Sequence, residues 1–394
     1  MAQFPQPEAC CLSGSGLTRR RVIKSVAALG AGGLVSGILP IRFARAAELT
    51  VGFIFIGPRD DWGWNQTFAE AGEALSAHPN VKVVEAGYLP ESTDYSSGKE
   101  SPEADAYARE LEELISPDGA GLVISTSFGN DPFLFAVASK NPSVLFRHAA
   151  VAARDKEPKN VGGQNALINQ GHYVNGVAAG LCTKTNKLGF IAGETEGAVL
   201  ANINSFLLGS RKTNPDATVQ LIVTGGWEDA GREAAAANKL IDAGCDVITC
   251  HLDSPKVVIE TAESRGVRTC GHAFDQAPLA PKGYITGAEF IWTRMFETFV
   301  ELMQRGESLP PFVTGGYDKG YVQSSPFGAG ANPAAINAAE TAIQAMKDQD
   351  PIFAGPIKDN TGRLVVPAGT TYGPYAPELM QTDYLIEGVI GSLT

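Results

Sequence analysis

The sequence is short of the features that would place it in several common classes directly. It has only six cysteines in 394 residues, and no two of them form a C-x-x-C pair. It contains no G-x-S-x-G stretch, and the loop Gly57–Trp64, which follows the first apolar strand, lacks the G-x-G-x-x-G of dinucleotide-binding proteins. A serine hydrolase and a nicotinamide dehydrogenase are therefore disfavoured, and we expect neither a cofactor nor a metal.

The cysteines fit that expectation. Cys250-His251 and Cys270-Gly271-His272 fall at the ends of neighbouring predicted strands, but their spacing matches no zinc-binding pattern. In a chain of this length, the cysteines after the first 46 residues are expected to be buried small hydrophobes rather than a disulfide framework. The sequence leaves their redox state open.

Long apolar runs are also missing. The longest, Val26–Pro40, is shorter than the roughly 20 residues that span a bilayer. It follows the twin-arginine pattern Thr18–Lys24 and precedes Ala44-Arg45-Ala46, an A-x-A cleavage site. This order predicts a twin-arginine signal peptide over residues 1–46, cleaved near Ala46/Ala47, and a periplasmic protein. An uncleaved amino-terminal anchor is the alternative.

Positive charge is scarce beyond that leader. The first 46 residues carry six Lys and Arg and one Glu, so the net charge falls from −12 for the whole chain to −17 for the remainder. An acidic body of this kind disfavours nucleic acid and anionic membrane surfaces as partners. About 350 residues exceed one small domain and suit two lobes.

Short apolar runs alternate with helix-like stretches throughout the remaining chain, at spacings of about 25–35 residues. Several runs are apolar throughout, as in Leu188–Ala192, which is typical of parallel strands buried on both faces. A polar break at Arg154–Asn165 separates two such series. We expect an α/β protein with two lobes, each a parallel sheet flanked by helices: residues 47–160 plus about 281–310, and residues 161–280 plus about 311–394. The chain would cross between them near Asn160–Asn165, Asp275–Pro281 and Gly306–Thr314.

Aromatic and acidic side chains recur just after the predicted strands, where open parallel sheets bind their ligands. Asp60, Asp61, Trp62 and Trp64 follow the first strand, and Trp227 lies in Gly225–Glu233 after a strand of the second series. If the lobes face each other, these loops line one cleft. Aromatic rings would stack on a flat ligand, and carboxylates would accept its N–H or O–H groups. The same carboxylates argue against a phosphorylated ligand.

The residues resemble a known family over nearly the whole chain after the leader. The stretches VGFIFIGPRDDWGWNQ, STSFGND, NPSVLFRHAA, NQGHYVNGVAAG, GGWEDAGREAAAANKLIDAGCDVI and GHAFDQAP are similar in order and spacing to the basic-membrane-protein family of type I periplasmic binding proteins, which serve ABC importers. The resemblance implies a two-lobed fold with a ligand cleft between the lobes. It further implies a purine base or nucleoside as ligand and an ABC permease as partner. The tryptophan-rich first loop is similar to the branch that binds free bases.

Carried over by position, the resemblance makes Trp64 and Trp227 the stacking aromatics, and Asp61 and Asp275 the acids that bind ribose or base. Nucleoside binders have an Asp where this chain has His148, which favours a free base or another flat heterocycle. The segment Tyr88–Asp105 is longer than usual and could reshape the mouth of the cleft. The expected ligand-binding residues are Asp61, Trp62, Trp64, Asn65, Phe128, Gly129, His148, Asn165, Trp227, Asp253 and Asp275.

Two other interpretations remain open at this point. The cleft has enough carboxylates for an exported carbohydrate-active hydrolase, which would use two of them in catalysis. One of Trp62 and Trp64 could also belong to a local core, and Trp292, on a helix-like stretch with Met295 and Phe299, is expected to do so. We expect a monomeric binding protein without catalytic activity. The identity of the ligand is not fixed by the sequence.

Overall fold

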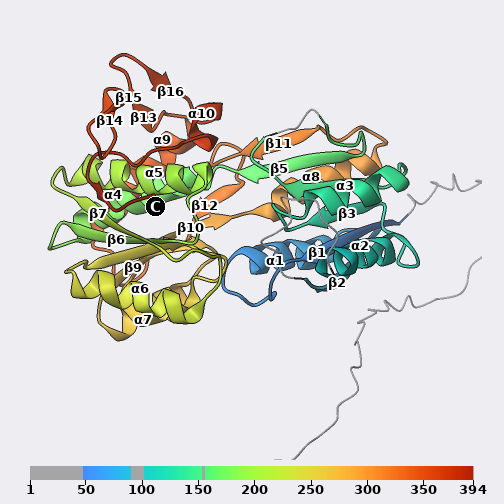
Figure 1. Cartoon of the computed structure of the whole chain (residues 1–394), viewed down its shortest axis with the longest axis horizontal. Helices are drawn as coiled ribbons and strands as arrows, with labels where there is room; N and C mark the ends of the chain where they lie inside the picture. Colours follow the sequence, from blue (N-terminus) through green and yellow to red (C-terminus); the bar gives the residue numbers. More distant parts are fainter. Residues whose placement is uncertain (1–47, 90–101, 153–155, 394) are drawn as a thin grey trace, which may run out of the picture. The chain divides into compact units, whose positions relative to one another are not determined.

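A computed structural model describes residues 48–89, 102–152 and 156–393 (Figure 1). The expected signal peptide and most of the segment Tyr88–Asp105 lie outside these residues. Within the part that is described, no helix has both the length and the apolar character needed to cross a membrane.

The first lobe is built on a fully parallel sheet of six strands. Its core strand β1 is LTVGFIF, and its last five residues are buried, as expected for a strand covered on both faces. The strand order is β11-β5-β4-β3-β1-β2. The strands are β1 (Leu49–Phe55), β2 (Val81–Tyr88), β3 (Leu122–Ser125), β4 (Leu145–Ala149), β5 (Val161–Ala166) and β11 (Phe312–Gly315).

The second lobe repeats this plan with a seven-stranded sheet in the order β12-β10-β9-β8-β6-β7-β17. Only the pairing of β10 with β12 is antiparallel within it. The strands are β6 (Lys187–Ala192), β7 (Thr218–Val223), β8 (Val247–His251), β9 (Arg268–Ala273), β10 (Tyr284–Phe290), β12 (Val322–Ser324) and β17 (Val389–Ile390). The expected α/β class with helix-flanked parallel sheets is confirmed.

Helices cover both faces of each sheet because successive strand residues point to opposite faces. In β1, Phe53 packs into the core that includes Phe68 of α1, whereas Ile54 packs into a separate core with Leu111 of α2. In the second lobe, α4 and α5 cover one face, and α6 and α7 cover the other. The helices are α1 (Trp64–Ser76), α2 (Pro102–Ile115), α3 (Asp131–Lys140), α4 (Ile168–Cys182), α5 (Gly197–Thr213), α6 (Ala230–Asp242), α7 (Lys256–Ser264), α8 (Trp292–Gln304) and α9 (Pro333–Lys347).

The chain crosses between the two lobes at positions that differ from the expected lobe boundaries. Strand β5 pairs with β4 in the first sheet, so the first crossing follows Ala166 rather than Asn160. The Pro- and Gly-containing stretch before Gly283 forms a short 3₁₀ turn, η2 (Ala277–Leu279), that joins β9 to β10 within the second sheet. The second crossing therefore comes at Ile291, between β10 and α8. The third follows β11, which pairs with β5.

The last residues form an addition to the second lobe, drawn in red in Figure 1. Two short antiparallel pairs and the helix α10 (Pro377–Met380) lead to β17, which adds a parallel edge strand beside β7. The short pairs are β13 (Phe353–Ala354) with β16 (Thr371–Tyr372), and β14 (Ile357–Lys358) with β15 (Leu364–Val366).

The expectation for the cysteines is confirmed, since Cys182, Cys245, Cys250 and Cys270 are all buried and unpaired thiols.

Candidate functional site

The carboxylate of Asp61 organises the first loop. Its Oδ1 accepts the backbone N–H groups of Gly63 (2.8 Å) and Gln66 (3.0 Å), and its Oδ2 accepts the backbone (2.8 Å) and side-chain (3.0 Å) N–H groups of Asn65. Asn65 and Gln66 lie in the first turn of α1, whose N–H groups have no partner within the helix. Burial raises the pKa of Asp61, and these hydrogen bonds oppose the rise. Both oxygens are thus engaged inside their own loop rather than presented to a ligand.

Asn65 has a similar internal role. Its side-chain oxygen accepts from the backbone N–H of Gly57 (3.1 Å) and from the hydroxyl of Thr126 (3.2 Å), which follows β3. The side chain is buried. Asn65 therefore ties the loop after β1 to the end of the neighbouring strand, and it belongs to the support of the site.

The same loop contacts the second lobe through three hydrogen bonds. The backbone N–H of Trp64 donates to the carbonyl of Asp253 (2.9 Å), and the Ser254 hydroxyl donates to the carbonyl of Asp61 (2.8 Å). The side-chain amide of Gln276 donates to the carbonyl of Trp62 (2.6 Å). The loops that follow β1, β8 and β9 therefore meet, as the sequence predicts for the carboxyl ends of facing sheets.

Two residues at these loops have a positive φ, a backbone conformation that residues other than glycine rarely adopt. Trp62 has a φ of 59°, and Ala273 at the end of β9 has a φ of 68°. Gln276 joins the two segments, since its amide also donates to the carbonyl of His272 (2.7 Å). Strained backbone of this kind concentrates at functional sites, where the surroundings hold it in place.

Trp64 lies in an aromatic cluster between the lobes and is 8% exposed. Its ring meets Trp292 and Phe290 edge to face, at centroid distances of 5.7 and 5.2 Å, and its indole N–H donates to the carbonyl of Thr126 (2.8 Å). Phe128, at 36% exposure, covers it from the end of β3 at 5.7 Å. Trp64 is thus largely a core residue, and one side of its ring is covered by Phe128. Trp292 is 1% exposed, which confirms its predicted place in the core.

Trp227 stands at the start of a row of imidazole rings in the second lobe. Its ring lies 5.7 Å from His251, which lies 4.3 Å from His272, and His272 lies 5.1 Å from His172. His172 Nε2 and His272 Nδ1 are 3.0 Å apart. Burial lowers the pKa of His251 to about 4, and it holds the pKa of His172 and His272 well below the usual value, with the other imidazoles adding to the effect. The row is therefore neutral near pH 7.

A cavity of about 120 Å³ lies beside these residues and includes an acid that sequence reasoning missed. Glu289, the penultimate residue of β10, is 8% exposed, and Phe274, Phe290 and Trp292 supply aromatic walls. Its only signal in the sequence was an acid inside an otherwise uncharged strand. The remaining lining residues are Thr67, Glu70, Ala273, Ile291, Thr293 and Gln323.

The other expected site residues have the following places. The carboxylate of Asp275 accepts the backbone N–H of Ala277 (2.9 Å), and Asp253 contributes its backbone to the contact with Trp64. The Gly129 N–H donates to the Ser127 hydroxyl (3.0 Å). Asn165 accepts from the N–H of Ala166 (2.9 Å) and is 9% exposed.

His148 does not have the environment expected of a ligand-binding residue. Its side chain is fully buried in the first lobe, with Nδ1 2.7 Å from a carboxylate oxygen of Asp131 and Nε2 3.2 Å from one of Glu157. Phe135 packs edge-on against the ring at 5.5 Å. Both nitrogens thus face carboxylates of the protein itself, and this pairing accounts for a histidine at the position.

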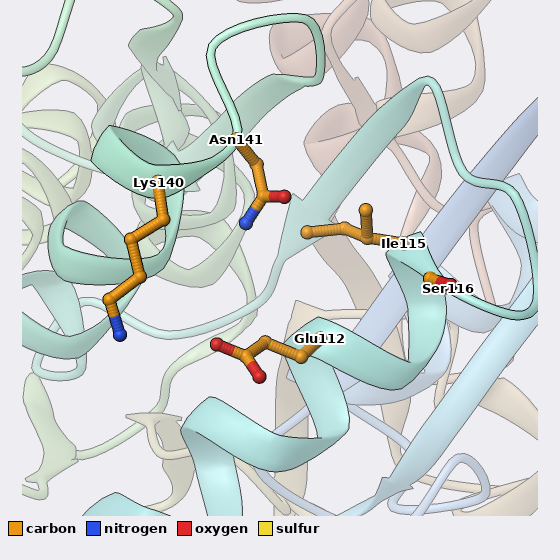
Figure 2. A pocket seen from close by; sticks show the side chains of 5 residues that line it. All are labelled: Glu112, Ile115, Ser116, Lys140 and Asn141. Carbon is orange, nitrogen blue, oxygen red and sulfur yellow. The ribbon is translucent and has the colours of Figure 1, made fainter.

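A second hollow, of about 310 Å³, lies elsewhere on the first lobe (Figure 2). Glu112 of α2 and Lys140 of α3 extend into it from the carboxyl ends of their helices. These helix ends precede β3 and β4, so the hollow lies at the edge of the sheet opposite to the loops described above. None of the described residues that line this hollow is aromatic, so they offer no ring on which a flat ligand could stack.

Comparisons with known proteins agree with this architecture. The family model for PnrA-like ABC transporter substrate-binding proteins, Bmp, matches residues 48–347. A purine-binding protein of Brucella abortus is 33% identical over 336 residues, which cover 85% of this chain and 92% of that protein. A putative ABC transporter glucose-binding protein of Haloferax volcanii is 27% identical over 313 residues, covering 79% and 76%.

Solved structures show the same fold. An ABC transporter solute-binding protein from Conexibacter woesei aligns with a TM-score of 0.61 at 22% identity, over 76% of this chain and 96% of that one. A solute-binding protein from Aeropyrum pernix aligns with a TM-score of 0.63 at 16% identity, over 79% and 93%. At these identities the likeness concerns the fold alone.

Proposed function

Because the chain belongs to the Bmp family of ABC transporter substrate-binding proteins, we propose that its ligand is a purine base or nucleoside. It would bind this ligand in the periplasm, after export by the twin-arginine pathway, and deliver it as a monomer to a permease in the inner membrane. The purine-binding relative in Brucella abortus supports this choice of ligand. We propose no catalytic step, since the family is one of binding proteins.

One observation carries the proposal: aromatic rings and carboxylates from both lobes gather where their loops meet. Trp64 and Phe128 come from the first lobe, and Trp227 and Phe274 come from the second. None of the described residues that line the adjoining cavity is Lys or Arg. Flat rings favour a heterocycle, and the lack of a basic cradle there disfavours a phosphate group.

Trp227 is the residue best placed to stack on that heterocycle. It is half-buried, and its ring rests on His251 at an interplanar angle of 46°. We propose that the exposed ring of Phe128, which covers Trp64, forms the opposing wall. Asp275, which is also half-buried, keeps lone pairs beyond its bond to Ala277 and is proposed as an acceptor for ligand N–H or O–H groups.

A sugar is the second candidate ligand, because the Haloferax volcanii relative is described as a putative glucose-binding protein. Sugars also bind against aromatic faces and carboxylates. The exported hydrolase is the further alternative, and it is distinguished by incubating the protein with an oligosaccharide. A binding protein returns its ligand unchanged, whereas a hydrolase releases smaller sugars.

The test is isothermal titration calorimetry with adenine, guanine, adenosine and glucose. Wild-type protein is expected to bind at least one of the purines, and Trp227→Ala is expected to weaken that binding by roughly 1–3 kcal/mol, the worth of one stacked base. This corresponds to about five- to 150-fold in Kd. Leu364→Ala, at an exposed position of the carboxyl-terminal addition, is the control. Binding of glucose alone, or unchanged purine affinity in Trp227→Ala, would contradict the proposal.

A further inference from the structure

Glu289 has one carboxylate oxygen held by the protein and one left over. Its Oε2 accepts from the side-chain amide of Gln323, on the neighbouring strand β12, at 2.7 Å. Its Oε1 is buried and has no hydrogen-bond partner among the described residues. The nearby hydroxyl of Ser325 lowers the pKa of this carboxyl but makes no hydrogen bond to Oε1. The same hydroxyl accepts a hydrogen bond from the hydroxyl of Tyr284 (3.0 Å). A buried acceptor without a donor is costly, so it indicates a partner that the chain itself does not supply.

The cavity beside Glu289 is lined by aromatic rings and by a second acid, Glu70. The cavity of about 120 Å³ has Phe274 and Phe290 on the side of the second lobe and Trp292 at the start of α8. Thr67 and Glu70 of α1 line it from the first lobe. Such a volume holds one heterocyclic edge rather than an extended chain.

The carboxylates around Glu289 restrict which ligand groups can bind beside it. Burial raises the pKa of Glu289, and the neighbouring carboxylates of Asp275 and Glu70 raise it further, while the amide of Gln323 and the nearby hydroxyl of Ser325 oppose the rise. An oxygen in this field attracts an N–H donor and repels a carbonyl or phosphate oxygen. Ala273, with its strained backbone, lines the same cavity from the end of β9.

We propose that Glu289 determines specificity in this protein, and that its Oε1 accepts an N–H of the exocyclic amino group of an aminopurine. Gln323 fixes the carboxyl in the orientation that points Oε1 to the ligand, and Phe274, Phe290 and Trp292 confine the ring edge beside it. The inference rests on the proposed purine-binding function and adds the feature that is recognised, which is the amino group. Purines with a methyl group or a hydrogen in its place would leave Oε1 without a donor.

The test compares adenine with 6-methylpurine, which keeps the ring and the size of the substituent but has no amino N–H. Wild-type protein is expected to bind adenine about ten- to a hundredfold more tightly, the range for a hydrogen bond to a buried charged group. Glu289→Met, which keeps the length of the side chain and removes the acceptor, is expected to bind both ligands within about threefold of each other. Glu307→Met, at an exposed position, is the matched control and should keep the wild-type ratio.

Each outcome bears on one of the two claims. If wild-type protein binds no purine, the proposed function fails. If wild-type and Glu289→Met proteins show the same preference for adenine, purine binding stands and the role of Glu289 is wrong. A thermal melt checks that Glu289→Met is folded. If it is not, Glu289→Gln replaces it, because an amide is a weaker acceptor and must then lower the preference for adenine at least threefold. A ligand that competes as a simple amine, tested with putrescine, would also overturn the assignment to an aminopurine.

Discussion

At the scale of single residues, Asp61 illustrates how a supporting acid resembles a binding acid in the sequence. Its place after a buried strand, beside tryptophans, predicts contact with a ligand. The structure instead gives its two oxygens four N–H donors from Gly63, Asn65 and Gln66. The carboxylate closes the loop and caps the first turn of α1, and in this way it positions Trp62 and Trp64.

Replacing Asp61 tests that role through stability. Asp61→Ala removes the cap and leaves buried N–H groups without acceptors, so the free energy of unfolding is expected to fall by about 2–4 kcal/mol. Urea denaturation measures the change. Asp60→Ala, at the exposed neighbouring position in the same loop, should shift the midpoint little. A loss of ligand affinity in Asp61→Ala with unchanged stability would restore the expectation of direct contact.

At the scale of elements, the row of imidazoles joins α4, β8 and β9, and it makes the second lobe sensitive to acid. An unfolded histidine has a pKa of about 6.5, while burial holds His251 at about 4 and His172 and His272 well below their usual value. Between these values the unfolded chain binds more protons than the folded one, so stability is lost as pH falls below about 6.5. For His172 and His272, the neighbouring imidazoles lower the pKa further, so protonation of one ring opposes protonation of the next.

We expect the free energy of unfolding to fall by about 3 kcal/mol between pH 6.5 and 4 through His251 alone. Urea midpoints at half-unit intervals measure the slope. Buried carboxyls with raised pKa, such as Asp61 and Glu289, act in the opposite direction at the acid end of this range. The comparison with His251→Asn is therefore the decisive one: this variant should show a shallower slope between pH 6.5 and 5. Parallel slopes would show that the row does not control acid stability.

The elements were predicted well where their pattern follows from burial. Strands such as β1 are continuous apolar runs because helices cover both faces, and that pattern is visible in the sequence. Strand β5 is VGGQNA, which has little strand propensity, although all six residues are buried. The sequence analysis did not place it in the first sheet, because it forms a strand only through its pairing with β4 and β11. Likewise no polar break marks the crossing at Ile291, which lies between Phe290 and Trp292.

The site was predictable in outline only. The position of each loop after a strand predicts that Trp62, Trp64 and Asp253 come together, since parallel strands share one carboxyl edge. The use of each side chain depends on contacts between residues far apart in the chain, as between His172 and His272, which are 100 positions apart. No local pattern distinguishes such a contact from an isolated buried histidine.

At the scale of the whole molecule, three segments cross between the lobes, and the loop after β1 adds direct contact between them. We propose that the lobes close on the ligand about these crossings. Gly63 lies at the contact, because a Cβ atom there would be 2.0 Å from the carbonyl oxygen of Asp253. A side chain at this position would act as a wedge between the first loop and the second lobe.

Gly63→Ala is therefore expected to hold the lobes apart and to weaken ligand binding at least tenfold. Small-angle X-ray scattering should show compaction of wild-type protein on ligand binding and a larger radius of gyration for Gly63→Ala at the same ligand concentration. Gly87→Ala, where an added Cβ meets no atom within 4 Å, is the matched control. An unchanged radius of gyration in wild-type protein with saturated ligand would contradict closure.

The aromatic residues around the facing loops have an optical consequence. The chain has only four tryptophans, and these are Trp62, Trp64, Trp227 and Trp292, so all of its indole emission originates next to the meeting point of the lobes. The indoles of Trp64 and Trp292 are 5.7 Å apart, close enough to exchange excitation energy. A heterocycle seated against Trp227 would quench part of this light, and movement of the first loop would shift its colour. The unlabelled protein is therefore its own fluorescent sensor for ligand, and the light it emits comes from the site rather than from the distant ends of either lobe.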